Sequence, residues 1–186
     1  MKLLYLDCCL RGGISRTKKI ADAFLEEASS RYEIERIDLE KLGFQPKLSQ
    51  DVLTTDIPME YQEASRKVAD CDLLVVAAPF YDMSVPSLLR AFIERCSIAG
   101  FTFYDPSLGG GCKAKALVYL TTRGFEIEDG SELDAASSYF KALCWLWKIS
   151  SFEIVSANGL DEVSPEEGEE RILAAKKKAK ELAKRI

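Results

Sequence analysis

Three neighbouring side chains near the N-terminus, Ser15, Arg16 and Thr17, have the chemistry of an anion site. Two hydroxyl groups and a guanidinium can all donate hydrogen bonds to a phosphate. They follow Gly12 and Gly13, which permit a tight bend, and they open a helical pattern. The free backbone N–H groups and the positive end of the dipole at a helix start favour a bound anion. The segment leaves a plainer alternative, in which Ser15 only caps the helix.

This segment matches neither of the two common phosphate-binding loops. "RGGISRT" (11–17) is neither G-x-x-x-x-G-K-[ST] nor G-x-G-x-x-G, so a P-loop and a dinucleotide fingerprint are both absent. A single phosphate cradle therefore favours a mononucleotide over a dinucleotide. Cys9 precedes the loop, near the helix start, and leaves two interpretations. It is either an oxidation-sensitive thiol with a low pKa or an unreactive, partly buried thiol.

Two further loops carry more chemistry than a connection needs. The segment "APFYDMSVP" (78–86) brings two aromatic rings, an acid and a thioether to the end of a buried strand, namely Phe80, Tyr81, Asp82 and Met83. The segment "TTRGFEIEDG" (121–130) follows another buried strand with Thr122, Arg123, Gly124 and Phe125. Each segment also has a plainer interpretation. The aromatic side chains of 78–86 could simply cover the end of the hydrophobic core, and 121–130 could be an ordinary surface turn.

Five short apolar runs, each a candidate strand, alternate with helical patterns. The expected strands are residues 2–6, 32–37, 72–79, 114–121 and 151–157. Such alternation predicts an α/β fold with a parallel sheet, helices on both faces and right-handed crossovers. The commonest five-strand order is 2-1-3-4-5, with the ligand crevice at the carboxyl ends of strands 1 and 3. The three loops would then meet at one edge, where a phosphate cradle beside an aromatic, polar slot suits FMN.

The helical patterns predict which side chains face the sheet. The expected buried faces are Ile20, Phe24 and Ala28; Val85, Leu88, Leu89, Phe92, Ile93 and Cys96; and Leu133, Ala136, Tyr139, Phe140, Leu143 and Trp147. A helix is expected near 59–69 after a long loop at 41–58, and the last helix is expected to begin at Ser164-Pro165 with Glu167 in the capping-box position. Trp145 and Trp147 cannot share one helix face, so one of them is expected to point away from the sheet.

Composition narrows the class of protein. The 186 residues are expected to form a single domain, residues 1–186, and the net charge of −5 disfavours nucleic acid and anionic membrane surfaces as partners. No apolar run approaches a membrane span. The six cysteines have no CxxC spacing, which predicts free thiols in a reducing cytoplasm. The absence of histidine removes a His-based triad and most zinc enzymes, and no metal is expected.

The segments at 78–103, "APFYDMSVPSLLRAFIERCSIAGFTF", and 121–124, "TTRG", together with the S-R-T loop, resemble the FMN-dependent NADH-azoreductase and NAD(P)H:quinone oxidoreductase family. The resemblance implies a flavodoxin-like three-layer sandwich that binds FMN. It also implies two-electron transfer from NADH or NADPH to a quinone, an azo compound or a similar small aromatic acceptor. Such proteins are usually homodimers with the flavin at the subunit boundary.

The same resemblance assigns positions around the cofactor. Cys9, Ser15, Arg16 and Thr17 would surround the phosphate; Phe80, Tyr81, Asp82 and Met83 would line the isoalloxazine; Thr122, Arg123, Gly124 and Phe125 would close its polar edge. No side chain is required as a catalyst because the cofactor does the chemistry, and Tyr81 is the nearest candidate for supplying a proton. The sequence departs from the family at Cys9, where serine is usual, at Asp82, where asparagine is usual, and at Phe125, where glycine is usual.

Two alternatives share this fold. One is a flavodoxin-like electron carrier, for which the basic last helix is a poor match, and the other is a flavin-free interaction module. A phospho-acceptor receiver domain is excluded, because it needs an aspartate at the end of the third strand, where this chain has Ala78-Pro79.

Overall fold

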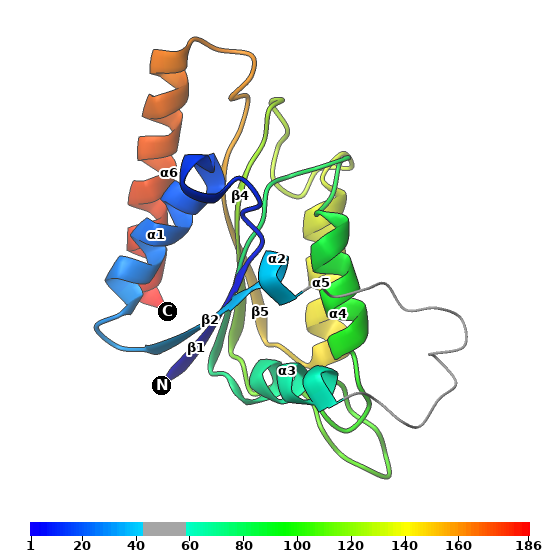
Figure 1. Ribbon diagram of the computed structural model, residues 1–186. Coiled ribbons are helices and arrows are strands. Elements are labelled where there is room, and N and C mark those ends of the chain that lie inside the picture. The colour runs from blue at the N-terminus through cyan, green and yellow to red at the C-terminus, as the bar shows by residue number, and fades with distance from the viewer. Residues whose placement is uncertain (43–58) are drawn as a thin grey trace.

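A computed structural model describes residues 1–42 and 59–186 and has one five-stranded parallel sheet at its centre (Figure 1). The strand order is β2-β1-β3-β4-β5, which confirms the order expected from the sequence. The strands are β1 (Lys2–Asp7), β2 (Glu33–Asp38), β3 (Leu73–Ala77), β4 (Ala116–Thr122) and β5 (Ser151–Ala157). All four neighbouring pairs are parallel, so every strand ends at the same edge of the sheet.

Helices cover both faces of this sheet, as expected. They are α1 (Arg16–Ala28), α2 (Leu39–Leu42), α3 (Met59–Asp70), α4 (Ser87–Cys96), α5 (Ala135–Trp147) and α6 (Pro165–Arg185), with a short 3-10 turn, η1 (Gly12–Ile14), before α1. In Figure 1, α1 and α6 lie together on one face, while α3, α4 and α5 lie on the other. Of the loop expected at 41–58, the first two residues belong to α2 and the rest lie outside the described residues.

Side-chain alternation along the central strands produces two separate cores. In β1, Leu4 and Leu6 pack toward α3, α4 and α5, while Leu3 and Tyr5 pack toward α1 and α6. Strands β3 and β4 divide their side chains in the same way, because successive residues of a strand point to opposite faces. Strands buried on both faces explain the nearly continuous apolar runs in the sequence.

The helix ends follow local rules. Ser15 caps α1 by accepting a hydrogen bond from the Lys18 N–H at 3.3 Å, and Ser164 caps α6 in the same way from Glu167 at 3.2 Å. The expected start of the last helix is therefore confirmed. The expectation that Leu133 faces the core is wrong, because Asp134 is the buried cap of α5 and Leu133, one residue before that cap, is exposed.

The two tryptophans of α5 point in opposite directions, as the sequence predicted. Trp147 is fully buried, whereas Trp145 lies on the outer side of α5 and is 82% exposed. All six cysteines are free thiols, and all but Cys112 are buried, including Cys96, which was expected on a buried helix face. Within residues 1–42 and 59–186, no helix combines the length and the apolar character needed to cross a membrane.

Candidate functional site

A cavity of about 450 Å³ opens at the carboxyl ends of β1, β3 and β4. This is the point at which the strand order reverses, where open α/β sheets bind their ligands. The residues on its wall are Leu10, Arg11, Ser15, Arg16, Thr17, Pro79, Phe80, Tyr81, Asp82, Met83, Thr122, Gly124, Phe125, Ile127 and Asp161. The structure thus brings together ten of the twelve residues predicted to contact a cofactor; Cys9 and Arg123 are not on the wall.

One end of the cavity is built from the start of α1. Ser15 and Thr17 are buried, and the Thr17 hydroxyl lies 2.7 Å from the Thr122 hydroxyl at the end of β4. The first N–H groups of a helix have no partner inside the helix, so this end of the cavity is rich in donors. Ser15 both caps α1 and lines the cavity, so its capping role and its place in the site are compatible.

The Arg16 guanidinium lies at the same end but is already paired. Its Nη1 donates to Asp161 Oδ1 at 2.8 Å and to the Leu160 carbonyl at 3.4 Å. Asp161 belongs to the loop after β5 and was not predicted from the sequence. That loop carries no motif, and its contacts with Arg16 and with the loop after β4 bring it to the cavity. Leu10, Arg11, Pro79 and Ile127 were also not named as site residues, although Leu10 adjoins a segment singled out in the sequence and the other three lie within such segments.

The loop after β3 supplies the aromatic side of the cavity through a tight turn. Tyr81 and Ser84 exchange backbone hydrogen bonds of 3.0 and 2.8 Å, and the two residues between them have positive φ angles, 48° at Asp82 and 63° at Met83. Positive φ at both central positions is the pattern of a type I′ turn, for which Asn, Asp and Gly are favoured. The turn leaves Tyr81 and Met83 partly exposed at the mouth.

The Arg123 side chain points into the protein, behind the aromatic wall. Its Nη2 donates to Asp134 at 2.8 Å and its Nη1 to Asp129 at 2.6 Å and to the Ile127 carbonyl at 2.8 Å. Its guanidinium carbon lies 4.8 Å from the centre of the Phe80 ring, a cation–π distance. Burial alone would raise the pKa of Asp134, but hydrogen bonds from Ser137 and Gly130 and the charge of Arg123 outweigh it, so the pKa lies below its usual value. Arg123 therefore supports the Phe80 ring from inside the protein and does not itself line the cavity.

The Cys9 thiol is not on the wall of this cavity. It is buried, and its Sγ donates to the Ala77 carbonyl at 3.8 Å. Burial, followed by the negative charge of Asp7, raises the pKa of Cys9 to about 12. A thiol with such a pKa is not ionised near neutrality, so the structure favours the unreactive interpretation over the oxidation-sensitive one.

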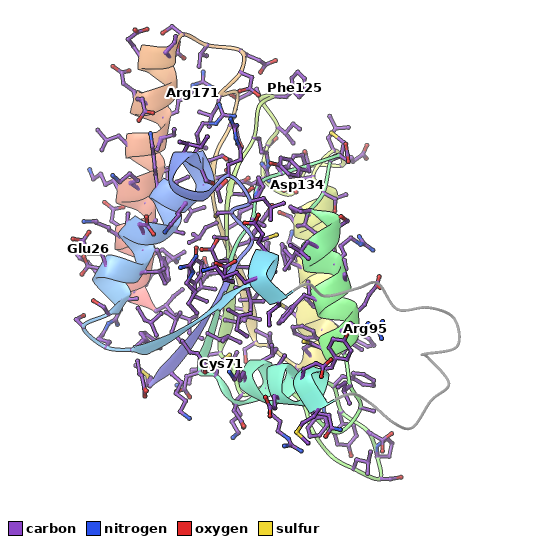
Figure 2. All side chains as sticks on the ribbon, in the orientation of Figure 1. Glu26, Cys71, Arg95, Phe125, Asp134 and Arg171 are labelled. Atoms are coloured by element: carbon purple, nitrogen blue, oxygen red, sulfur yellow. The ribbon has the colours of Figure 1, made fainter. Side chains whose placement is uncertain are left out.

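The open end of the site is apolar and uncovered. Phe125 is 67% exposed and lies at this end of the sheet, while Cys71 lies at the opposite end (Figure 2). An open parallel sheet of order 2-1-3-4-5, with a cavity at its switch point lined by a helix start and by aromatic side chains, defines a doubly wound α/β protein with a crevice of the kind that binds small ligands.

Comparison with known proteins agrees with this class. A family model described as a flavodoxin-like fold matches residues 1–183, and the chain belongs to that family. It is 30% identical to FMN-dependent NADH:quinone oxidoreductase 2 of Clostridium acetobutylicum, over 98% of both chains. It is also 30% identical to an FMN-dependent NADH:quinone oxidoreductase of Clostridium beijerinckii, again over 98% of both. The family expected from the sequence is therefore confirmed.

Solved structures share the fold at lower identity. An azoreductase from Bacillus anthracis strain Sterne superimposes with a TM-score of 0.83 at 21% identity, covering all of both chains. An FMN-dependent NADH-azoreductase from Bacillus anthracis strain Ames Ancestor, in complex with FMN, has a TM-score of 0.81 at 19% identity and covers 99% of this chain and 98% of that one.

Proposed function

We propose that this protein is an FMN-dependent oxidoreductase that takes two electrons from NADH or NADPH and passes them to a quinone, an azo compound or a similar small aromatic acceptor. The observation that carries the proposal is the cavity at the switch point, with hydrogen-bond donors at one end and aromatic side chains at the other. The names and near-complete coverage of the curated relatives support it.

The residues on the wall fit FMN. The Thr17 and Thr122 hydroxyls share one hydrogen bond, which leaves one of the two O–H groups free to donate into the cavity. Together with the N–H groups at the start of α1, this O–H group gives enough donors to bind one phosphate. Phe80, Tyr81 and Met83 offer the apolar surface that a flat ring system needs.

The cofactor supplies the redox chemistry, and the side chains of the protein position the cofactor. Bound FMN supplies the two-electron chemistry between the nicotinamide donor and the acceptor. Ser15, Arg16 and Thr17 would hold its phosphate, and the turn at Tyr81–Ser84 would set the distance between the ring system and the mouth. Tyr81 is partly exposed on the wall and is the candidate for supplying a proton to an acceptor.

We further propose a homodimer whose partner covers the mouth. Phe125, Tyr81 and Met83 are exposed there, and the Ala135 N–H donates to the Met83 carbonyl at 3.2 Å, which ties the turn to the start of α5. The outer face of the same helix carries the exposed Trp145. Exposed apolar side chains in such numbers favour a protein partner. Light scattering at micromolar concentration should give twice the chain mass of 20.8 kDa, and Trp145→Glu should shift it toward the monomer.

The proposed activity has a direct test. Heat should release a yellow chromophore with the mass of FMN, and the loaded protein should oxidise NADH in the steady state when a quinone is present. FMN without NADH turnover would instead identify an electron carrier. No binding of FMN after incubation would identify a flavin-free interaction module and overturn the proposal.

The compartment and the extent of the folding unit are also proposals. Six free thiols, five of them buried, suit a reducing cytoplasm rather than an oxidising compartment. We propose that residues 1–186 act as a single domain around the one cofactor.

A further inference from the structure

Asp161 places a carboxylate on the wall of the cavity, at the end where the donors gather. Its Oδ1 accepts from Arg16 Nη1 at 2.8 Å, while a Cβ atom built on Gly124 would lie 2.3 Å from its Oδ2. The carboxylate therefore packs directly on the Cα of Gly124, in space that any larger residue at position 124 would fill. An acid next to an anion cradle opposes the binding of an anion.

The backbone holds Asp161 in this place. Its N–H donates to the Gly124 carbonyl at 2.9 Å, and the Leu160 N–H donates to the Arg123 carbonyl at 3.1 Å. The loop after β5 is thus hydrogen-bonded to the loop after β4. The position of the acid is a property of the fold and does not depend on the ion pair alone.

The other cations of α1 are paired with acids away from the cavity. Lys18 pairs with Asp22 at 2.5 Å and Lys19 with Glu169 at 2.6 Å, and neither of these acids is on the cavity wall. Among the α1 ion pairs in the described residues, the pair of Arg16 is the one whose acid lines the site. A phosphate that enters the cradle meets a guanidinium already engaged by a carboxylate.

We propose that Asp161 competes with the cofactor phosphate for Arg16 and so sets the affinity of the site for a flavin phosphate relative to the unphosphorylated flavin. This inference rests on the proposed function, because it assumes that FMN occupies the cavity. Binding of the phosphate would redirect Arg16 from Asp161, and the carboxylate would stay nearby as an unfavourable charge. The carboxylate of Asp161 would therefore make the affinity of the site for FMN lower than that of the same site without the acid.

The test is a fluorescence titration of the apoprotein with FMN and, separately, with riboflavin, which lacks the phosphate. Asp161→Asn keeps the size of the side chain and should lower the dissociation constant for FMN about fivefold, since exposed charge interactions reach about 1 kcal/mol. The dissociation constant for riboflavin should not change. In an Arg16→Gln background, the gain for FMN from Asp161→Asn should disappear.

The control is Glu169→Gln, which removes the same charge from an ion pair of nearly equal exposure outside the cavity. The side chains of Lys19 and Glu169 are 40% and 64% exposed, against 34% and 63% for Arg16 and Asp161. This control should leave both dissociation constants unchanged.

Each other result decides against the inference. Unchanged or weaker FMN binding in Asp161→Asn would mean that the acid is neutral to the phosphate or positions Arg16 for it. Equal gains for FMN and riboflavin, or a gain that survives in the Arg16→Gln background, would also overturn the competition. If the wild-type protein binds neither flavin, the proposed function itself is wrong. This outcome is distinct from those above, because each of them requires that the wild-type protein binds FMN.

Discussion

The hydroxyl oxygens of Thr17 and Thr122 lie 2.7 Å apart, although 105 positions separate them in the chain. Both residues are buried, and together they join the start of α1 to the end of β4. A pair of hydroxyls shares one hydrogen bond and retains one hydrogen to donate elsewhere. The two hydroxyls therefore act as one unit, and their contributions to the binding of a ligand in the cavity should not be independent.

Thr17→Val should weaken FMN binding by about 1 kcal/mol, and Thr122→Val should do about the same, because each leaves the remaining hydroxyl without the hydrogen-bond partner that orients it. The double variant should cost less than the sum of the two, since either change alone breaks the unit. The measurement is the dissociation constant of FMN for the apoprotein in all three variants. Strictly additive losses would show that the two hydroxyls act separately.

Asp134→Asn should destabilise the fold by about 3–5 kcal/mol at pH 7, because it leaves the buried guanidinium of Arg123 short of a counter-charge. The folded pKa of Asp134 lies below its ordinary value of 3.8, so the stabilisation is fully present above that pH and is lost as the pH falls through the folded pKa. Urea unfolding should therefore show a large difference from wild type at pH 7 that narrows below about pH 4.

The matched control for this experiment is Asp22→Asn, which breaks the exposed Lys18–Asp22 pair. Its cost should stay below about 1 kcal/mol. Equal costs for the two variants would contradict a special role for the buried pair.

Cys9 should resist alkylation at pH 8, with or without FMN, because its pKa of about 12 leaves almost no thiolate. Mass spectrometry after timed exposure to iodoacetamide would locate the modified thiols. Burial raises the pKa of Cys112 as well, although it is the one cysteine that is not fully buried, so the comparison is the labelling of the same thiols after unfolding in urea. Rapid labelling of Cys9 in the folded protein would revive the oxidation-sensitive interpretation.

Asp82→Asn should raise the flavin midpoint potential at pH 7. Reduction adds negative charge to the cofactor, and a nearby carboxylate opposes it where an amide does not. Because Asp82 is exposed, screening limits the expected shift to about 10–30 mV. A spectroscopic redox titration measures it, with Glu170→Gln, an exposed change on α6, as the control. Identical potentials would place Asp82 away from the flavin.

The sequence predicted the sheet more fully than the site. Apolar runs and their alternation determine which strands are buried on both faces, so the order of the sheet followed from general rules. Asp161 could not be predicted, because it reaches the cavity through backbone pairing between the loops after β4 and β5. The inward direction of Arg123 was equally hidden, since it depends on Asp134, which lies eleven residues later in the chain and caps α5.

Leu133 was misassigned for a related reason. Helical periodicity placed it on the same face as Ala136 and Phe140, but α5 begins only at Ala135, after the buried cap Asp134. Periodicity therefore does not apply to Leu133, and its exposure follows from where the helix starts.

The opposite orientations of Trp145 and Trp147 give the protein two built-in optical reporters. These are the only tryptophans in the sequence, one fully buried and the other 82% exposed. Trp147 emission should be blue-shifted and shielded from acrylamide, so it follows unfolding of the core. Trp145 emission should be red-shifted and readily quenched, so it follows whatever covers the outside of α5. A single unlabelled sample can thus report folding and subunit association separately.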